Sequence, residues 1–143
     1  MKLELDEKTY EQITQLCSEG DSAMQQNDLN QAYQHYKKAW DMLPEPQHEW
    51  EAATWIMTAL GDVYFYSKDF AHVISTLEYA LACPGGLGNP YIHLRLGQAY
   101  YEVNDLDKAA DHLTRCYMGS ELDLLGEEDE KYLNFLKSKI ILN

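Results

Sequence analysis

The chain is poor in basic residues, and this shortage excludes several classes of partner. Its 143 residues include 11 lysines and arginines against 24 aspartates and glutamates, which gives a formal net charge of −13 at pH 7. Charge of this sign repels phosphate groups. We therefore expect neither nucleic acid nor a membrane as a partner, and expect a basic protein instead. The alternative is that the acidic charge only keeps the protein soluble.

Cysteines and long apolar runs are also scarce. The three cysteines, Cys17, Cys83 and Cys116, are far apart and form no Cys-x-x-Cys pair. No apolar run approaches the roughly 18 residues that span a membrane. The charged first residues do not resemble a signal peptide. These features predict a cytoplasmic protein with reduced thiols.

Patterns that carry catalysis or bind metals are missing. None of the five histidines stands in a His-Glu-x-x-His or Cys/His spacing. The run from Pro84 to Gly88 is followed by no Gly-Lys-Ser/Thr, so we interpret it as a structural turn. The acidic run 121–130 lacks the residue order of a calcium loop. We predict no enzymatic activity, no metal and no cofactor, and we expect His93 to be a buried core residue.

One spacing recurs three times along the chain. In each copy a glycine is followed eight residues later by an aspartate and an apolar residue: Gly20 with Asp28, Gly61 with Asp69, and Gly97 with Asp105. Sixteen residues after each glycine stands a bulky residue: Tyr36, Leu77 and Leu113. The glycines are 41 and 36 residues apart, a period typical of helical solenoids.

Apolar residues recur at steps of three and four, which predicts paired helices. The expected segments are about 6–26 and 28–43, 47–66 and 70–82, and 90–103 and 106–119. Asp28 is expected to cap the second helix of the first pair, and Lys68-Asp69 and Asn104-Asp105 are expected to separate the helices of the other two pairs. A last amphipathic helix over about 128–142 is expected to cover the apolar end of the stack. The sequence thus predicts an all-α superhelix of three helix pairs and a capping helix, forming one domain over 1–143.

The repeated residues resemble the tetratricopeptide repeat. The matching stretches are Leu60-Gly61-x-x-Tyr64 and Leu96-Gly97-x-x-Tyr100, with the alanines Ala39 and Ala80 and the proline Pro44. The resemblance implies repeats over about 13–46, 54–87 and 90–123, and a protein-binding role. It also implies that the first helix of each pair lines a concave groove.

Helical spacing identifies the groove-facing residues that we expect to bind a partner. They are Asp21, Met24, Gln25, Trp55, Asp62, Phe65, Tyr66, Tyr91, Arg95, Gln98, Tyr101 and Glu102. We expect at least three of their five aromatic rings to be exposed, because aromatic residues dominate binding energy at interfaces. A second possible surface is the acidic edge formed by Glu127, Glu128, Asp129 and Glu130.

Some tetratricopeptide domains clamp the C-terminal carboxylate of heat-shock chaperones with lysine, asparagine and arginine. The corresponding positions here are Cys17, Asp21, Ala59, Tyr91 and Arg95, of which only Arg95 fits. A co-chaperone role is therefore not expected.

The chain resembles small acidic bacterial tetratricopeptide proteins encoded near polymorphic toxins. This resemblance rests on the stretch from Leu43 to Trp55, the loop 83–90 and the acidic segment before Tyr132. It implies an immunity protein that neutralises a cognate, basic toxin domain. Two alternatives are a type III secretion-type chaperone that holds an extended peptide and a structural homo-oligomer.

Overall fold

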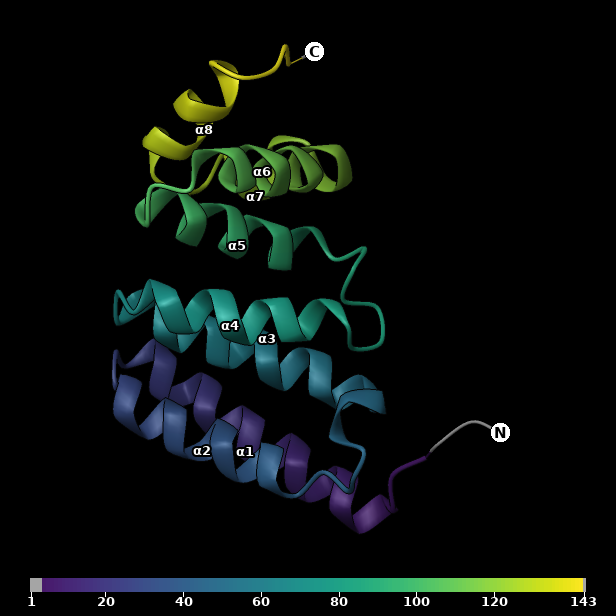
Figure 1. Cartoon of the computed structure of the whole chain (residues 1–143). Coiled ribbons are helices and arrows are strands. Elements are labelled where there is room, and N and C mark those ends of the chain that lie inside the picture. The colour runs from purple at the N-terminus through teal and green to yellow at the C-terminus, as the bar shows by residue number, and fades with distance from the viewer. Residues whose placement is uncertain (1–3, 143) are drawn as a thin grey trace.

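The computed structural model describes residues 4–142, and over that range the chain forms helices and no strand. Three antiparallel helix pairs stack on one another in chain order, with the two termini at opposite ends of the stack (Figure 1). The pairs are α1 (Glu7–Gln25) with α2 (Leu29–Asp41), α3 (Glu51–Tyr66) with α4 (Phe70–Leu81), and α5 (Pro90–Glu102) with α6 (Leu106–Ser120). The short helices α7 (Leu122–Leu125) and α8 (Glu130–Lys137) complete the stack.

The turn inside each pair has the same geometry three times. Asn27, Lys68 and Asn104 adopt left-handed backbone conformations with φ of 58°, 60° and 66°. The aspartate that follows each of them accepts a hydrogen bond from the backbone amide three residues later, a cap that the sequence predicted for Asp28. A residue with positive φ ends one helix, and a carboxylate starts the next.

The three repeated glycines lie where the helices of each pair approach most closely. A Cβ atom added to Gly20 would lie 2.5 Å from the Tyr36 ring, and one added to Gly61 would lie 2.6 Å from Leu77 Cδ2. Gly97 meets Leu113 at the same 2.6 Å. The bulky residue sixteen positions later therefore occupies the space that the glycine leaves, which explains the sequence period.

The third helix starts later than its apolar pattern suggested. Residues 47–49 form a separate 3₁₀ turn, η1 (Gln47–Glu49), and Trp50 is extended with φ −89° and ψ 142°. The Trp50 indole Nε1 donates to the carbonyl of Pro44 at 2.7 Å, which fixes this bend. Since Trp50 is buried in the first core, its periodicity with α3 reflects packing and not a continuous helix.

The end of the chain caps the stack with two short helices instead of one long helix. The helix expected over 128–142 is shorter, because the Asp129 carboxylate accepts from the Lys131 amide and caps α8, which ends at Lys137. Leu125, Tyr132 and Leu136 are buried against residues of α5 and α6. The expected covering of the last pair is thus present, over a shorter span.

No helix in residues 4–142 is both long and apolar enough to cross a membrane.

Candidate protein-binding surface

We call the side of the stack that carries the expected binding residues of α1, α3 and α5 the concave face. A buried guanidinium organises its C-terminal half. Arg95 of α5 is only 3 % exposed. Its Nε donates to Asp62 Oδ1 at 2.8 Å, and its Nη1 donates to Glu128 from the segment between α7 and α8. Two carboxylates from distant parts of the chain therefore balance one cation, as a buried charge requires.

Aromatic rings complete this Arg95 cluster. The guanidinium carbon lies 4.3 Å from the centre of the Phe65 ring, and Nη2 donates to the hydroxyls of Tyr66 and Tyr91. Burial alone would lower the pKa of Arg95, but the Asp62 carboxylate and the other partners raise it above its ordinary value. The group is a permanent internal cation.

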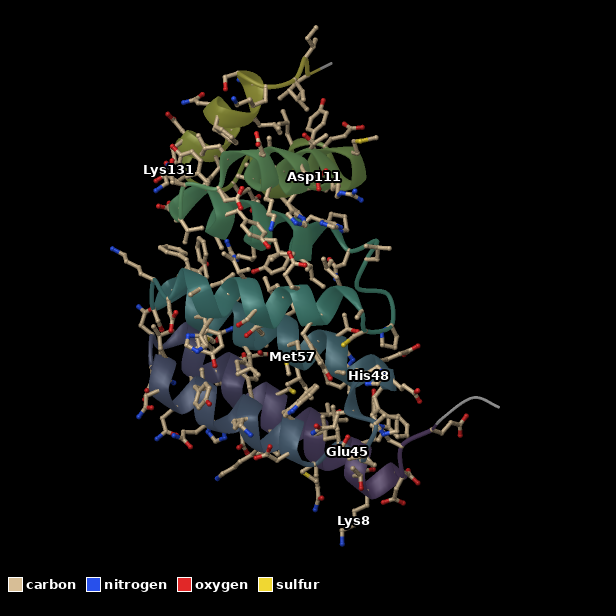
Figure 2. All side chains as sticks on the ribbon, in the orientation of Figure 1. Lys8, Glu45, His48, Met57, Asp111 and Lys131 are labelled. Atoms are coloured by element: carbon tan, nitrogen blue, oxygen red, sulfur yellow. The ribbon has the colours of Figure 1, made fainter. Side chains whose placement is uncertain are left out.

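The C-terminal segment covers the rest of this half. Gln98 is fully buried, and its Nε2 donates to Glu128 at 2.7 Å. Glu102 pairs with Lys131 at 2.6 Å and accepts from the Tyr132 hydroxyl at 2.7 Å. Burial would raise the pKa of Glu102, but these partners lower it below its ordinary value. Figure 2 places Lys131 at this end of the stack, far from Lys8 near the N-terminus.

The N-terminal half of the concave face is hollow instead. Two adjoining hollows, of about 580 and 790 Å³, share Glu51, Trp55 and Pro84. Together we call them the Trp55 depression. It is lined by residues before and at the start of α1, by the η1–α3 junction, by one side of α3 and by the loop between α4 and α5.

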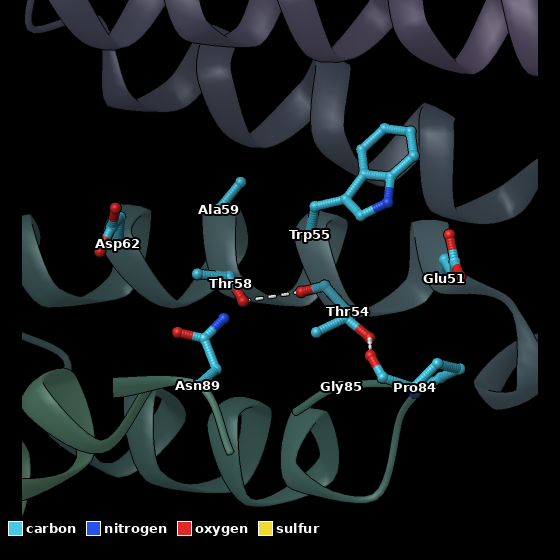
Figure 3. Close-up of a pocket in the computed structure, with 9 residues that line it drawn as sticks. All are labelled: Glu51, Thr54, Trp55, Thr58, Ala59, Asp62, Pro84, Gly85 and Asn89. Atoms are coloured by element: carbon cyan, nitrogen blue, oxygen red, sulfur yellow. Dashed lines mark hydrogen bonds between the residues drawn. The ribbon is translucent and has the colours of Figure 1, made fainter. Parts of the chain in front are cut away.

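Hydrogen bonds fix the walls of the Trp55 depression. Thr54 Oγ1 donates to the Pro84 carbonyl at 2.6 Å, and Thr58 Oγ1 donates to the Thr54 carbonyl at 2.7 Å. In Figure 3 the Trp55 ring extends to one side of α3, while Pro84, Gly85 and Asn89 lie on the other side. The far end of the loop is held by His93, whose Nε2 lies 2.7 Å from the Leu87 carbonyl.

Charge distinguishes the depression from the Arg95 cluster. Its lining includes the exposed glutamates Glu4, Glu7, Glu49 and Glu51, none of which forms an ion pair with another residue in 4–142. Among the described residues that line it there is no lysine, arginine or histidine. Only Asp62, at the border of the two regions, has its charge balanced, by Arg95.

The five aromatic residues expected to bind a partner differ in exposure. Trp55 and Tyr66 are exposed, at 38 % and 55 %, whereas the rings of Phe65, Tyr91 and Tyr101 are half-buried. Two rings are thus exposed where three or more were expected, because the cluster and α8 cover the others.

In the first repeat, Asp21 and Gln25 are exposed and Met24 is half-buried. Asp21 accepts a hydrogen bond from the Tyr36 hydroxyl. On the acidic edge, Glu127, Asp129 and Glu130 are exposed, while Glu128 points into the Arg95 cluster. Arg95, Gln98, Glu102 and Glu128 are therefore engaged inside the chain in this structure, because the capping segment supplies their partners.

Several residues of the depression were not singled out from the sequence. Tyr10, whose ring centre is 6.5 Å from that of Trp55, lies one turn into α1. Glu7 and Glu51 lie in the first turns of α1 and α3, and Pro84 lies in the loop interpreted only as a turn. The repeat period identifies equivalent positions in the three helix pairs. It does not show which loops and helix ends lie next to one another in the folded chain.

Comparisons with known proteins support the fold. The first tetratricopeptide domain of Spaghetti (RPAP3), solved bound to the HSP90 peptide SRMEEVD, is 20 % identical, with a TM-score of 0.69 over 90 % of this chain and 92 % of that one. The first such domain of human RPAP3 is 21 % identical, with a TM-score of 0.70 over 89 % and 94 % of the two chains.

The N-terminal domain of the stress-induced protein STI-1 from C. elegans is 21 % identical, with a TM-score of 0.67 over 94 % and 98 %. No protein-family model and no curated protein matches the sequence. These likenesses show that the chain has the fold of a tetratricopeptide-repeat solenoid.

Proposed function

We propose that the protein is a non-catalytic, cytoplasmic binding module that neutralises a basic toxin domain in bacteria as an immunity protein. The observation that carries the proposal is the Trp55 depression, a preformed hollow with exposed rings and four glutamates that form no ion pair within residues 4–142. Acidic and aromatic character in one concave surface suits a cationic protein partner.

Electrostatics favours a folded, basic partner over a small molecule. A net charge of −13 attracts a positively charged domain over a distance and speeds association, an effect that salt weakens. Within residues 4–142, no group of three or more histidines, cysteines or acids is arranged to hold a metal ion.

The Arg95 cluster argues against recognition of a C-terminal carboxylate. One solved neighbour was determined with the HSP90 peptide SRMEEVD. Here the one arginine that could meet such a carboxylate is already paired with Asp62 and Glu128. A peptide ending in acidic residues would have to displace the chain's own glutamate.

The test is capture of the partner. The tagged protein is expected to retain a basic toxin domain encoded beside its own gene, with nanomolar or tighter affinity and an association rate that falls with salt. Recovery of an unfolded, extended segment would instead support the secretion chaperone. Absence of affinity for any neighbouring gene product, or a stable homo-oligomer that closes the concave face, would contradict the proposal.

A further inference from the structure

We propose that the Trp55 depression binds an arginine side chain presented by the partner protein. This inference rests on the proposed function, to which it adds a location and a chemical group. It commits to arginine because both the charge and the shape of the lining favour a planar cation.

The first argument is unbalanced charge. Glu4, Glu7, Glu49 and Glu51 come from two stretches of the chain, 4–7 and 49–51, and line one depression without a cation among the described residues. Mutual repulsion of these carboxylates is relieved when a cation enters between them. By contrast Asp62, at the border of the depression, and Glu102 and Glu128, beyond it, already have basic partners.

The second argument is the aromatic surface beside these carboxylates. Trp55 is 38 % exposed, and Tyr10 meets it edge to face. The face of an indole is the best aromatic partner for a cation, and a guanidinium can stack on it while it donates to a carboxylate. Lysine, with its compact and strongly hydrated ammonium, is less suited to this arrangement.

The third argument is that the chain already builds such a site around its own arginine. Arg95 lies over the Phe65 ring with Asp62 and Glu128 beside it. The Trp55 depression contains the same components, a ring and several carboxylates, but no guanidinium. Its walls are fixed by the Thr54–Pro84 hydrogen bond, so little ordering is needed on binding.

The probe for this inference is a blocked Gly-Gly-Arg-Gly-Gly peptide, titrated into the ¹⁵N-labelled full chain. The readout is the indole N–H resonance of Trp55, assigned with Trp55→Phe. Trp40 is the internal reference, because it packs on Tyr79 between α2 and α4. We expect a saturable shift of the Trp55 signal below about 10 mM peptide. Binding should weaken with added salt, be at least about threefold weaker for the lysine peptide, and be lost for the citrulline peptide.

Variants locate the binding site. The double change Glu7→Gln and Glu51→Gln is expected to weaken arginine-peptide binding at least about tenfold. The matched control is Asp107→Asn with Asp123→Asn, which removes the same charge from two exposed acids that also lie in first helical turns. The control should change the affinity less than about twofold.

Three outcomes of the peptide titration overturn the inference. An unmoved Trp55 signal, equal losses in the two double variants, or equal binding of the citrulline peptide would show that the depression does not recognise arginine. A toxin domain that binds both double variants equally would leave the proposed function standing without this site. Arginine-peptide binding without any cognate toxin would support the arginine site and contradict the proposed function.

Discussion

The two halves of the concave face use the same kinds of side chain for different ends. In the C-terminal half, carboxylates and rings surround Arg95, and the segment with Glu128 closes the surface. In the N-terminal half, carboxylates and rings surround an empty hollow. The comparison teaches that acidic residues on a solenoid groove indicate a binding surface only where the chain supplies no cation of its own.

Removal of the internal cation should give the largest effect. Arg95→Ala leaves Asp62 and Glu128 facing each other without a counter-charge, so we expect a loss of about 3–5 kcal/mol in unfolding free energy. Urea denaturation measures it. Arg115→Ala is the control, since its pair with Asp111 is exposed and should contribute less than about 1 kcal/mol. Similar unfolding free energies for Arg95→Ala and Arg115→Ala would show that the buried Arg95 pairs stabilise the C-terminal half no more than an exposed pair does.

Truncation of the exposed ring should affect binding and not stability. Trp55→Ala is expected to weaken partner binding by about 2 kcal/mol or more, roughly thirtyfold, because aromatic anchors dominate interface energies. Titration calorimetry with the captured partner measures it, and circular dichroism checks that helicity is kept. Tyr79→Ala is the control, because Tyr79 is an exposed ring outside the depression. Unchanged affinity of Trp55→Ala would place the interface elsewhere.

Substitution of the repeated glycines should lower stability by a similar amount in both halves. Gly61→Ala and Gly97→Ala each bring a Cβ atom to 2.6 Å from a leucine methyl group. We expect each to lose about 1–2 kcal/mol, since overpacking outweighs the usual gain of alanine in a helix. Thermal unfolding measures the loss. Gly88→Ala, with no atom within 4 Å of the added Cβ, should be neutral in that assay. A gain in stability at either helical glycine would contradict the close approach.

Acid should destabilise the closed half through a buried histidine pair. His93 and His112 share an Nδ1–Nδ1 contact of 3.0 Å, and burial followed by the charge of His93 lowers the pKa of His112 below 6.5. Below that pH the unfolded chain takes up a proton that the folded chain resists, so stability falls as pH falls.

This dependence amounts to at most about 1.4 kcal/mol per pH unit. His112→Asn should make the stability less dependent on pH between about pH 5 and 7, where histidine titrates. Denaturation at a series of pH values measures the slope, and His48→Asn, exposed in η1, is the control. Equal slopes for the wild type and His112→Asn would contradict the effect.

Local signals in the sequence predicted the scaffold well. The glycine with its bulky residue sixteen positions later and the Asp28 cap are short-range features, and the structure confirms both. The same cap recurs at Asp69 and Asp105. The predicted start of α3 was wrong because of Trp50. Its indole packs into the core, so Trp50 keeps helical spacing although it lies outside the helix.

The concave face was harder to predict, because its state depends on which distant segments meet. Nothing near Arg95 in the sequence shows that Glu128, 33 residues away, folds back onto it. Likewise the depression joins Glu7, Glu51 and Pro84 across three loops and helix starts. Helical spacing predicted positions on α3 and α5 for a partner, but not which of these positions the chain covers itself.

The most direct test is the affinity of the captured basic partner for two charge-matched variants. We predict that Glu7→Gln with Glu51→Gln weakens binding at least about tenfold, while Asp107→Asn with Asp123→Asn changes it less than about twofold. Equal affinities for the two variants, or tighter binding to the first, would contradict the account.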